Sequence, residues 1–353
     1  MLFDDAWHKL QSNRNNEINA IPFGFKKFEQ YLPGILKKHY YILTANAGVG
    51  KSQITDFMFL YQPFNYWLQH KDKFDIEIHY FSLEMDRESK IIAGMAKRLY
   101  EEHRLRVSPT QLLSFNRNKL PAHIFDAVYK TREYFELLSS KVKFYDDQMT
   151  PTHINDIVQK YAKENGKEVT RTVDGHVYFD KYIPNNPNKF VIFITDHLAE
   201  LDLERGLDLK GTIERHSDNN RKNRNKYGFT FIDVQQQMAA KEDQEFYQGL
   251  SIITKLEPSL HGLGESKLTQ RKANIVLGLF APNRFEIPEY RGYNIKALQD
   301  NFRSLSILKN RNGVSNVHTG LYFDGATNYF EELPRGTEMT TAFYEELRKR
   351  TKD

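Results

Sequence analysis

Hydrophobic residues in this chain gather in short, nearly continuous runs that alternate with longer segments of helical periodicity. Continuous apolar runs of strand length are typical of strands covered on both faces, and they occur at residues 40–43, 76–81, 142–145, 190–194, 229–234 and 275–280. Apolar residues at helical spacing follow two of these runs, over residues 54–61, where Pro63 is expected to end the helix, and over residues 91–99. This alternation predicts an α/β fold with a mostly parallel central sheet and helices on both faces.

The C-terminal part has a different pattern. Strand-like runs at residues 304–308, 317–323 and 329–330 are separated by the pairs Asn312-Gly313 and Asp324-Gly325. Such pairs are typical of turns between antiparallel strands. The sheet is therefore predicted to end in a C-terminal antiparallel hairpin.

The chain has 353 residues, and at roughly 150 residues per domain this length suggests about two domains. Residues 1–20 are predicted as an N-terminal arm with a short amphipathic helix, and residues 165–189, rich in Gly, Asn, Pro and Tyr, as an inserted hairpin. Neither segment supplies a second core. We therefore expect one large domain over residues 21–335, followed by a helical tail over residues 336–353.

Composition excludes several classes of protein. Charged residues make up 27% and hydrophobic residues 40% of the chain, which excludes a disordered polymer. The absence of cysteine excludes disulfide frameworks, thiolate zinc sites and cysteine nucleophiles, and favours a reducing cytoplasm. No apolar run reaches the length of a membrane span, the N-terminus is unlike a secretory signal, and the net charge of +4 is too small to indicate a partner.

A Gly-rich segment joins the first strand to the first helix. It nearly matches the G-x-x-x-x-G-K-[ST] pattern of a phosphate-binding loop, with Ala45 at the first glycine position. Small residues let backbone N–H groups surround phosphates, and the helix N-terminus adds a positive dipole. Lys51 would contact the β and γ phosphates of ATP, and Ser52 would hold Mg²⁺. The candidate nucleotide-binding residues are Ala45, Asn46, Ala47, Gly48, Val49, Gly50, Lys51 and Ser52.

Hydrolysis also needs an acid that positions the metal and a group that activates water. Asp196 follows the run 190–194 at the carboxyl end of a predicted strand, where ligands bind in such sheets. It is the candidate Mg²⁺ ligand, and a helix cap or turn residue is the alternative. Glu84 follows the run 76–81 and would polarise the attacking water, although a Glu in this position is by itself more often a solvated acid.

Further stretches resemble, in the correct order, the replicative helicases of the DnaB type, a branch of the RecA-like ATPases. The resemblance implies a RecA-like P-loop ATPase and runs from about residue 20 to residue 333. Each stretch is short, but six in the correct order are specific together. They are Ile21–Phe25 with Leu32–Ile35, FSLEM at 81–85, residues 144–150, ITDHLAEL at 194–201, VQQQ at 234–237, and residues 308–313 with LYFDGATNYFEEL at 321–333.

The resemblance assigns roles to two of these motifs. Glu84 would be the catalytic base. Gln236 would be the sensor that couples the γ-phosphate to the DNA loops, and alignment of the preceding strand favours it over Gln235 and Gln237.

Lys309 and Arg311 resemble finger residues that reach the nucleotide of a neighbouring subunit. A guanidinium supplied in trans can accelerate hydrolysis by about 10³–10⁵, and it requires a head-to-tail oligomer that closes into a ring or winds into a filament. Without the resemblance, this Lys-Asn-Arg run would be interpreted as a solvated turn.

DNA contacts are expected in residues 255–271, which correspond to a loop that faces the central channel in the family. Backbone N–H groups, hydroxyls and lysine suit contacts to phosphates that do not depend on sequence, and the candidates are Gly262, Gly264, Glu265, Ser266 and Lys267. A surface loop without this role is the alternative. The chain departs from the family in this region, because Met238-Ala239-Ala240 and Gly264 replace arginines and Asn274 replaces an acid.

These features predict an ATP- and Mg²⁺-dependent DNA helicase that forms a hexameric ring and moves 5′ to 3′ on single-stranded DNA during replication. The family's N-terminal helical domain has no counterpart, which fits a compact, phage-encoded protein that acts in the host cytoplasm with a separate primase or loader protein. Residues 2–12 would dock on the adjacent subunit or pack on their own core. Two alternatives stay open, a RecA-like recombinase filament and a non-motor regulatory ATPase of the same fold.

Overall fold

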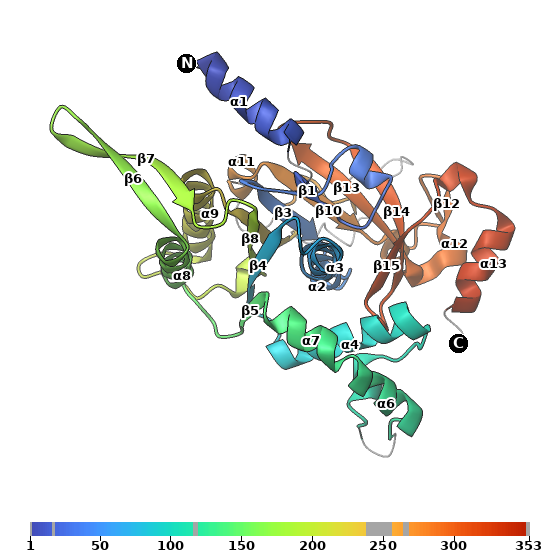
Figure 1. The fold of residues 1–353 in the computed structure, drawn as a ribbon. Coiled ribbons are helices and arrows are strands. Elements are labelled where there is room, and N and C mark those ends of the chain that lie inside the picture. The colour runs from blue at the N-terminus through green and yellow to red at the C-terminus, as the bar shows by residue number, and fades with distance from the viewer. Residues whose placement is uncertain (1, 16–17, 116–118, 238–255, 264–267, 351–353) are drawn as a thin grey trace.

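The computed structural model describes residues 2–15, 18–115, 119–237, 256–263 and 268–350. Its centre is a nine-stranded sheet of order β15-β14-β13-β10-β3-β9-β8-β4-β5 (Figure 1). The strands from β10 to β5 pair in parallel, whereas β13, β14 and β15 continue the sheet by antiparallel pairing. The strands are β3 (Tyr40–Ala45), β4 (Asp75–Ser82), β5 (Val142–Tyr145), β8 (Lys189–Asp196), β9 (Thr230–Gln236), β10 (Ile275–Phe280), β13 (Phe302–Asn310), β14 (Val317–Asp324) and β15 (Tyr329–Glu332). The predicted fold class is confirmed.

Three two-stranded sheets and a set of helices surround this sheet. The small sheets pair β1 (Ala20–Ile21) with β2 (Ile35–Leu36), β6 (Gly166–Val173) with β7 (His176–Pro184), and β11 (Glu289–Tyr290) with β12 (Tyr293–Asn294). The α-helices are α1 (Leu2–Asn15), α2 (Lys51–Thr55), α3 (Gln62–Gln69), α4 (Arg87–His103), α5 (Pro109–Leu112), α6 (Ala122–Lys130), α7 (Arg132–Ser139), α8 (Pro151–Glu164), α9 (Leu209–Tyr227), α11 (Thr269–Lys272), α12 (Ile295–Leu298) and α13 (Thr341–Arg350). A π-helix, η2 (Asp56–Tyr61), and five 3₁₀ turns, η1 (Phe28–Gln30), η3 (Leu198–Glu200), η4 (Pro282–Phe285), η5 (Gln299–Asn301) and η6 (Gly336–Glu338), complete the described elements.

Both faces of the parallel strands are covered by helices (Figure 1). The helices α2, η2, α3, α4 and α7 pack on one face, and α8 and α9 pack on the other. Neighbouring residues of β8 show the two sides, because Ile194 belongs to the first apolar cluster and Phe193 to the second. Successive side chains of a strand point to opposite faces, so a strand buried on both sides has the continuous apolar run seen in the sequence.

The helix after the Gly-rich segment does not end at Pro63, and that prediction is wrong. The elements α2, η2 and α3 follow one another without a break from Lys51 to Gln69, and Pro63 lies in the first turn of α3. Proline lacks an N–H and therefore cannot donate the hydrogen bond of a regular α-helix. In η2 the backbone hydrogen bonds span five residues instead of four. The hydrogen-bond register of the helix therefore changes just before Pro63, the residue that has no N–H to donate.

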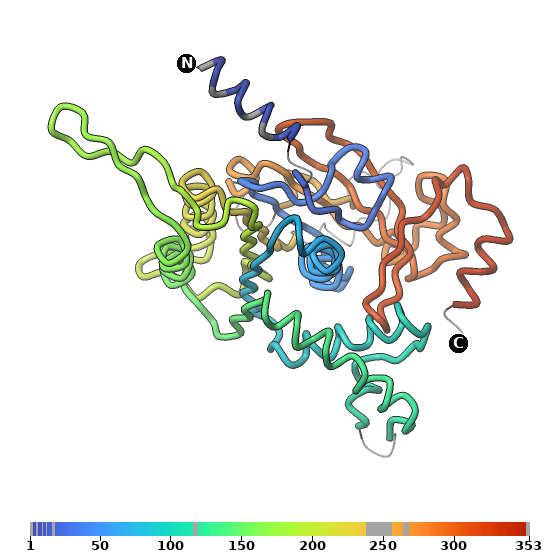
Figure 2. Tube along the Cα trace, in the orientation of Figure 1, coloured from blue at the N-terminus to red at the C-terminus, as the bar shows by residue number. Residues whose placement is uncertain are grey.

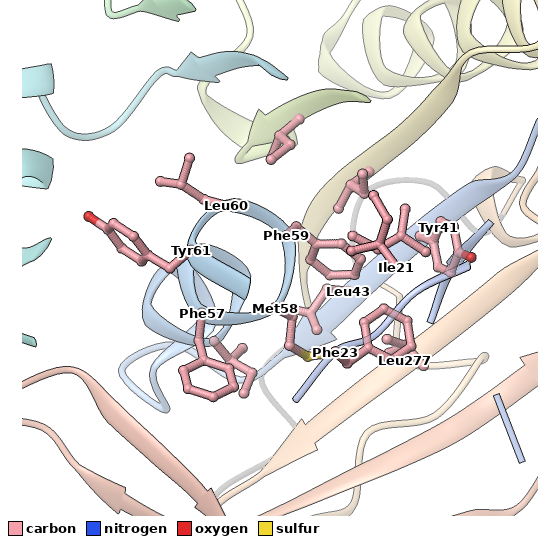
Figure 3. Close-up of a cluster of buried hydrophobic side chains, with 14 of the residues drawn as sticks. Ile21, Phe23, Tyr41, Leu43, Phe57, Met58, Phe59, Leu60, Tyr61 and Leu277 are labelled. Atoms are coloured by element: carbon pink, nitrogen blue, oxygen red, sulfur yellow. The ribbon is translucent and has the colours of Figure 1, made fainter. Parts of the chain in front are cut away.

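Aromatic side chains of η2 form the main contact between this helix and the sheet. The ring of Phe59 lies 5.8 Å from that of Tyr41 on β3 and 5.7 Å from that of Phe23, measured between ring centroids. Met58 and Leu43 belong to the same buried cluster (Figure 3). This packing holds the helix that begins at the phosphate loop firmly against the strand that leads into the loop.

Two segments extend away from the body of the molecule, α1 and the β6–β7 hairpin (Figure 2). The hairpin turns at Asp174 and Gly175, whose φ angles of 49° and 77° suit a tight turn between antiparallel strands. On α1, Phe3 and Trp7 stack on each other but remain exposed to solvent. At the other end of the chain, α13 packs into a third apolar cluster through its buried Leu347. Within the described ranges, none of the helices is both long and apolar enough to cross a membrane.

Candidate functional site

The candidate site lies at the carboxyl ends of the parallel strands, around the loop between β3 and α2. β3 ends at Ala45, and α2 begins at Lys51. Gly48 and Gly50 have φ angles of 69° and 96°, which glycine adopts without the strain that a side chain would cause. These turns bend the chain around the N-terminus of α2, where backbone N–H groups are free of the helix and suit an anion.

Two polar side chains of this loop are buried. Lys51 is almost fully buried, and burial lowers its pKa below the usual value, although the carboxylates of Asp196 and Glu84 partly offset this effect. The side-chain nitrogen of Asn46 is buried and has no hydrogen-bond partner among the described residues. A buried donor without a partner is costly. It therefore indicates that a ligand with acceptor oxygens would complete this site.

Asp196 at the end of β8 lies beside the start of α2. Ser52 Oγ donates to Asp196 Oδ1 over 3.2 Å, which joins residues 144 positions apart in the sequence. The backbone N–H of Leu83 donates to the carbonyl oxygen of Asp196 over 2.9 Å. This bond fixes the turn that carries Glu84 next to Asp196.

The carboxylate of Asp196 is buried and held from behind. Its Oδ2 accepts from Tyr80 Oη over 3.1 Å and from Lys90 Nζ over 3.2 Å. Burial opposes ionisation, but the charge of Lys90 and the hydrogen bonds from Ser52, Lys90 and Tyr80 outweigh it and lower the pKa of Asp196. Asp196 is therefore ionised at neutral pH and presents Oδ1 to the phosphate loop.

Glu84 is more than half exposed at the mouth of the site, where His197 contacts it. His197 Nε2 lies 3.4 Å from Glu84 Oε2. The backbone N–H of Ala199 donates to His197 Nδ1 over 3.2 Å, so Nε2 carries the ring proton that faces Glu84. The loop lysine, Ser52, Asp196 and Glu84 thus meet in one place, as expected from their positions after strands.

The donor set fits Mg²⁺ bound together with a nucleotide. Mg²⁺ prefers oxygen ligands and is commonly held by one or two protein oxygens plus phosphates and water, and Ser52 Oγ and Asp196 Oδ1 are such a pair. No cluster of three or more acidic or histidine side chains able to hold a metal occurs in the part of the chain that the structure describes. Two oxygens leave most positions around Mg²⁺ to phosphate and water, so the pair suits a cation that arrives with a nucleotide.

The three glutamines at the end of β9 point in two directions. Gln235 accepts from Thr269 Oγ1 over 2.7 Å, and Gln237 donates to Thr44 Oγ1 over 3.0 Å and to the carbonyl of Ser259 over 3.1 Å. Gln236 lies between them and is directly paired with Ala45. Because side chains alternate along a strand, Gln236 faces the side of the sheet that α2 covers. Gln235 and Gln237 therefore lie on the opposite face from Gln236, and the sensor role of Gln236 stays a prediction.

Lys309 and Arg311 lie at the opposite end of the sheet from the phosphate loop of the same chain. Lys309 pairs with Val276 near the start of β10, whereas Ala45 pairs with Leu279 near its end. Both cationic side chains donate to the carbonyl of Ala273, over 3.0 and 3.1 Å. Burial lowers the pKa of Lys309 to about 8. The structure does not bring these two residues to the phosphate loop of their own subunit.

Of the candidate DNA-binding residues, only Gly262 is described, and Gly264, Glu265, Ser266 and Lys267 lie outside the described residues. The backbone N–H of Gly262 donates to the carbonyl and the hydroxyl of Ser259, over 3.2 and 3.1 Å. It is therefore already used, and Gly262 does not offer the free donor expected from the sequence. Gln237 contacts the same turn through Ser259, which links the end of β9 to this segment.

Sequence reasoning missed several residues that surround the loop. Arg284 on η4 donates to the carbonyl of Ala47, and the buried Arg303 donates to the carbonyl of Val49 over 2.8 Å. Lys90 and His197, described above, were also not identified. His197 follows Asp196 directly, so its position in the motif was a signal. The other three carry none, because an isolated Arg or Lys in a polar segment resembles any solvated residue.

Comparisons with known proteins agree with this architecture. No protein-family model and no curated protein matches the chain. Among solved structures, one of an ATPase domain is similar with a TM-score of 0.68 and 17% identity, over 94% of this chain and 98% of that one. A DnaB-like replicative helicase, described with its interactions with primase, is similar with a TM-score of 0.67 and 17% identity, over 94% of this chain and 67% of that one. The chain therefore has the fold of the DnaB-type helicase ATPase core, which confirms the resemblance at the level of the fold.

Proposed function

We propose that this protein is an ATP-dependent DNA helicase that assembles into a ring and moves 5′ to 3′ on single-stranded DNA during replication. The observation that carries the proposal is the meeting of Lys51, Ser52, Asp196 and Glu84 at one edge of the sheet. Nucleotide hydrolysis needs these four kinds of group together. We infer DNA as the polymer along which the protein moves, because the chain shares its fold with a DnaB-like replicative helicase.

In this proposal each residue has a chemical task. The loop N–H groups and Lys51 bind the phosphates of ATP, and Ser52 and Asp196 hold Mg²⁺, which neutralises charge on the phosphates when bound. Glu84 accepts the proton of the attacking water. The ring N–H of His197 orients the Glu84 carboxylate. Gln236 senses the γ-phosphate from the neighbouring strand.

The ring is proposed because the finger residues cannot act on their own loop. Lys309 and Arg311 lie at the far end of the sheet from the phosphate loop of their own subunit. In a head-to-tail assembly they would instead reach the nucleotide bound by the neighbouring subunit. The exposed apolar side chains Phe3, Trp7 and Leu10 on α1 also need a partner surface. We take residues 1–20 as an arm to the adjacent subunit, residues 21–335 as the ATPase unit with the inserted hairpin 165–189, and residues 336–353 as a tail.

Single-stranded DNA is the proposed track, contacted by the segment that includes Gly262 and residues 264–267. A separate primase or loader protein is a proposed partner, because the DnaB-like neighbour is described with its interactions with primase. Hexameric state and direction of movement follow from the same resemblance.

The proposal is tested by ATP hydrolysis with and without single-stranded DNA, together with strand displacement on a forked duplex. We expect DNA to stimulate hydrolysis and ATP to drive displacement from a 5′ tail. The Lys51→Ala variant should lose both activities, because it removes the cation that contacts the phosphates. If the rate of ATP hydrolysis does not change on addition of single-stranded DNA, and no strand is displaced from either tail, the result would instead favour the non-motor ATPase.

A further inference from the structure

A buried lysine lies directly behind Asp196 and serves two carboxylates at once. Lys90 Nζ is 3.2 Å from Asp196 Oδ2, and 3.1 and 3.2 Å from the two carboxylate oxygens of Asp56. It also donates to Tyr80 Oη over 2.8 Å. The side chain of Lys90 is 1% exposed and that of Asp196 is 2% exposed. A buried charge requires a partner, so these groups must be considered together.

The two oxygens of Asp196 are held from opposite sides. Oδ2 accepts from Lys90 and lies 3.1 Å from Tyr80 Oη, which is also 2.6 Å from Asp56 Oδ1, whereas Oδ1 accepts from Ser52 in the phosphate loop. Rotation of the carboxylate would break bonds on both sides. The contacts behind the residue therefore determine which oxygen faces the loop.

Asp56 is a second negative partner for the positive charge of Lys90. The group contains one positive and two negative side chains, and Tyr80 stays neutral because burial raises its pKa well above 10. With Asp56 present, Lys90 and Asp56 balance each other, and the net negative charge remains for Asp196. Without Asp56, the whole charge of Lys90 would be directed at Asp196 and would compete with any cation bound at Oδ1.

The same contacts join three elements of the site. Asp56 follows Ser52 by one helical turn, Lys90 is in the first turns of the helix that follows Glu84, and Asp196 ends β8. We propose that Lys90 and Asp56 form a positioning pair: Lys90 orients Asp196, and Asp56 balances the positive charge of Lys90, so that this charge does not oppose a divalent cation bound at Asp196. The inference rests on the proposed nucleotide site.

The test measures how much Mg²⁺ tightens the binding of a fluorescent ADP analogue to the full-length chain, as the ratio of Kd in EDTA to Kd in MgCl₂. In Asp56→Asn we expect this ratio to fall about tenfold, because an uncompensated charge then opposes the cation. The Kd in EDTA should change by less than about twofold, because no phosphate contact is removed. In Asp56→Asn/Lys90→Met the opposing charge is absent too, so the ratio should recover to within about threefold of the wild type, and the remaining loss reflects the missing contact that orients Asp196.

A matched control is present on the same helix. Lys97 is as buried as Lys90 and pairs with Glu101 one turn further along, away from the phosphate loop. Glu101→Gln removes the carboxylate beside a buried lysine, as Asp56→Asn does, and should leave the Mg²⁺ ratio unchanged. Thermal unfolding of all variants separates a local effect from a loss of fold.

Three results would overturn the proposal: an unchanged ratio in Asp56→Asn, an equal fall in Glu101→Gln, or no recovery in the double variant. A wild-type chain that does not bind the ADP analogue would overturn the proposed nucleotide site, and one that binds it equally in EDTA and MgCl₂ would overturn the Mg²⁺ site; either result removes this inference as well. A normal wild-type ratio with an unaffected Asp56→Asn would overturn the positioning pair alone.

Discussion

Glu84 has an exposed carboxylate on a turn that buried groups hold in place. The backbone bond from Leu83 to Asp196 holds its turn in place, and His197 Nε2 faces its carboxylate over 3.4 Å. Solvent can reach the side chain, while its position is set by buried groups. This arrangement distinguishes Glu84 from the solvated acid that the sequence alone would suggest.

Glu84→Gln should abolish hydrolysis while ATP still binds. We expect turnover to fall by about 10²–10⁴, the usual contribution of a general base, because the amide cannot accept the proton of the water. ATP turnover and the Kd of a fluorescent nucleotide measure the two effects. Glu88→Gln is the control, since Glu88 is an exposed acid in the first turn of α4, and equal losses in both variants would argue against the assignment.

Lys37 provides a pH prediction away from the candidate site. Burial lowers its pKa from 10.5 to about 8, while Nζ donates to the carbonyl of Pro187 over 2.6 Å. Between these two pH values the unfolded chain binds more protons at Lys37 than the folded chain, so the free energy of unfolding rises with pH. Below pH 8 both states are charged and this contribution is constant.

The measurement is the melting temperature of the wild type and of Lys37→Met between pH 7 and 10.5. The difference, wild type minus variant, should increase with pH across the interval above 8. Lys309 titrates in the same range but is present in both proteins and cancels. A difference that stays flat would show that Lys37 keeps its ordinary pKa.

At the scale of elements, the packing of α4 against η2 determines where Lys90 and the preceding turn with Glu84 lie. Gly94 of α4 faces Tyr61 of η2, and a Cβ at Gly94 would lie only 2.0 Å from Tyr61 Oη. Tyr61 is buried and cannot move without disturbing the core. The two helices therefore approach as closely as they do only because position 94 has no side chain.

Gly94→Ala should lower the free energy of unfolding by about 1–3 kcal/mol through overpacking. Chemical denaturation measures this change, and Tyr61→Phe added to Gly94→Ala should recover part of the loss by removing the hydroxyl. The control is Gly211→Ala in α9, where the nearest atoms are 3.2 Å or more from the added Cβ. If both substitutions have the same effect, the contact between α4 and η2 is not tight.

At the scale of the whole molecule, the distance between the phosphate loop and the finger residues leads to a complementation test. Arg311→Ala subunits keep an intact phosphate loop, and Lys51→Ala subunits keep intact fingers. Each variant alone should lose ATP turnover by about 10³ or more. In an equal mixture, about one interface in four combines an intact loop with an intact finger, so about a quarter of wild-type turnover should return.

Subunit exchange is checked by mixing the wild type with an equal amount of Lys51→Ala/Arg311→Ala, which lacks both groups and should lower the turnover per wild-type subunit to about half of the unmixed value. Recovery in the first mixture requires that the active site be shared between copies. If exchange occurs and the two variants together stay inactive, Arg311 does not act on a neighbour's nucleotide.

The sequence by itself determined the class of the fold, the phosphate loop and the acids after the strands. These features are local: a run of apolar residues or a contiguous loop pattern requires only neighbours along the chain. Residues 190–194 predicted a buried strand for this reason, and β8 covers them. The prediction that the helix ends at Pro63 was wrong because the π-helical segment before Pro63 has no sequence signature of its own.

Only the tertiary structure decided which of these residues meet and what lies behind them. The order β3-β9-β8-β4 places Asp196 beside Ser52, and this order comes from strand pairings between residues far apart in the sequence. Lys90 and Asp56 are ordinary polar residues in the sequence, and they become a buried ion pair only when two helices pack over β4 and β8. Because burial is a property of the packed molecule and not of the residue type, no local pattern could identify them.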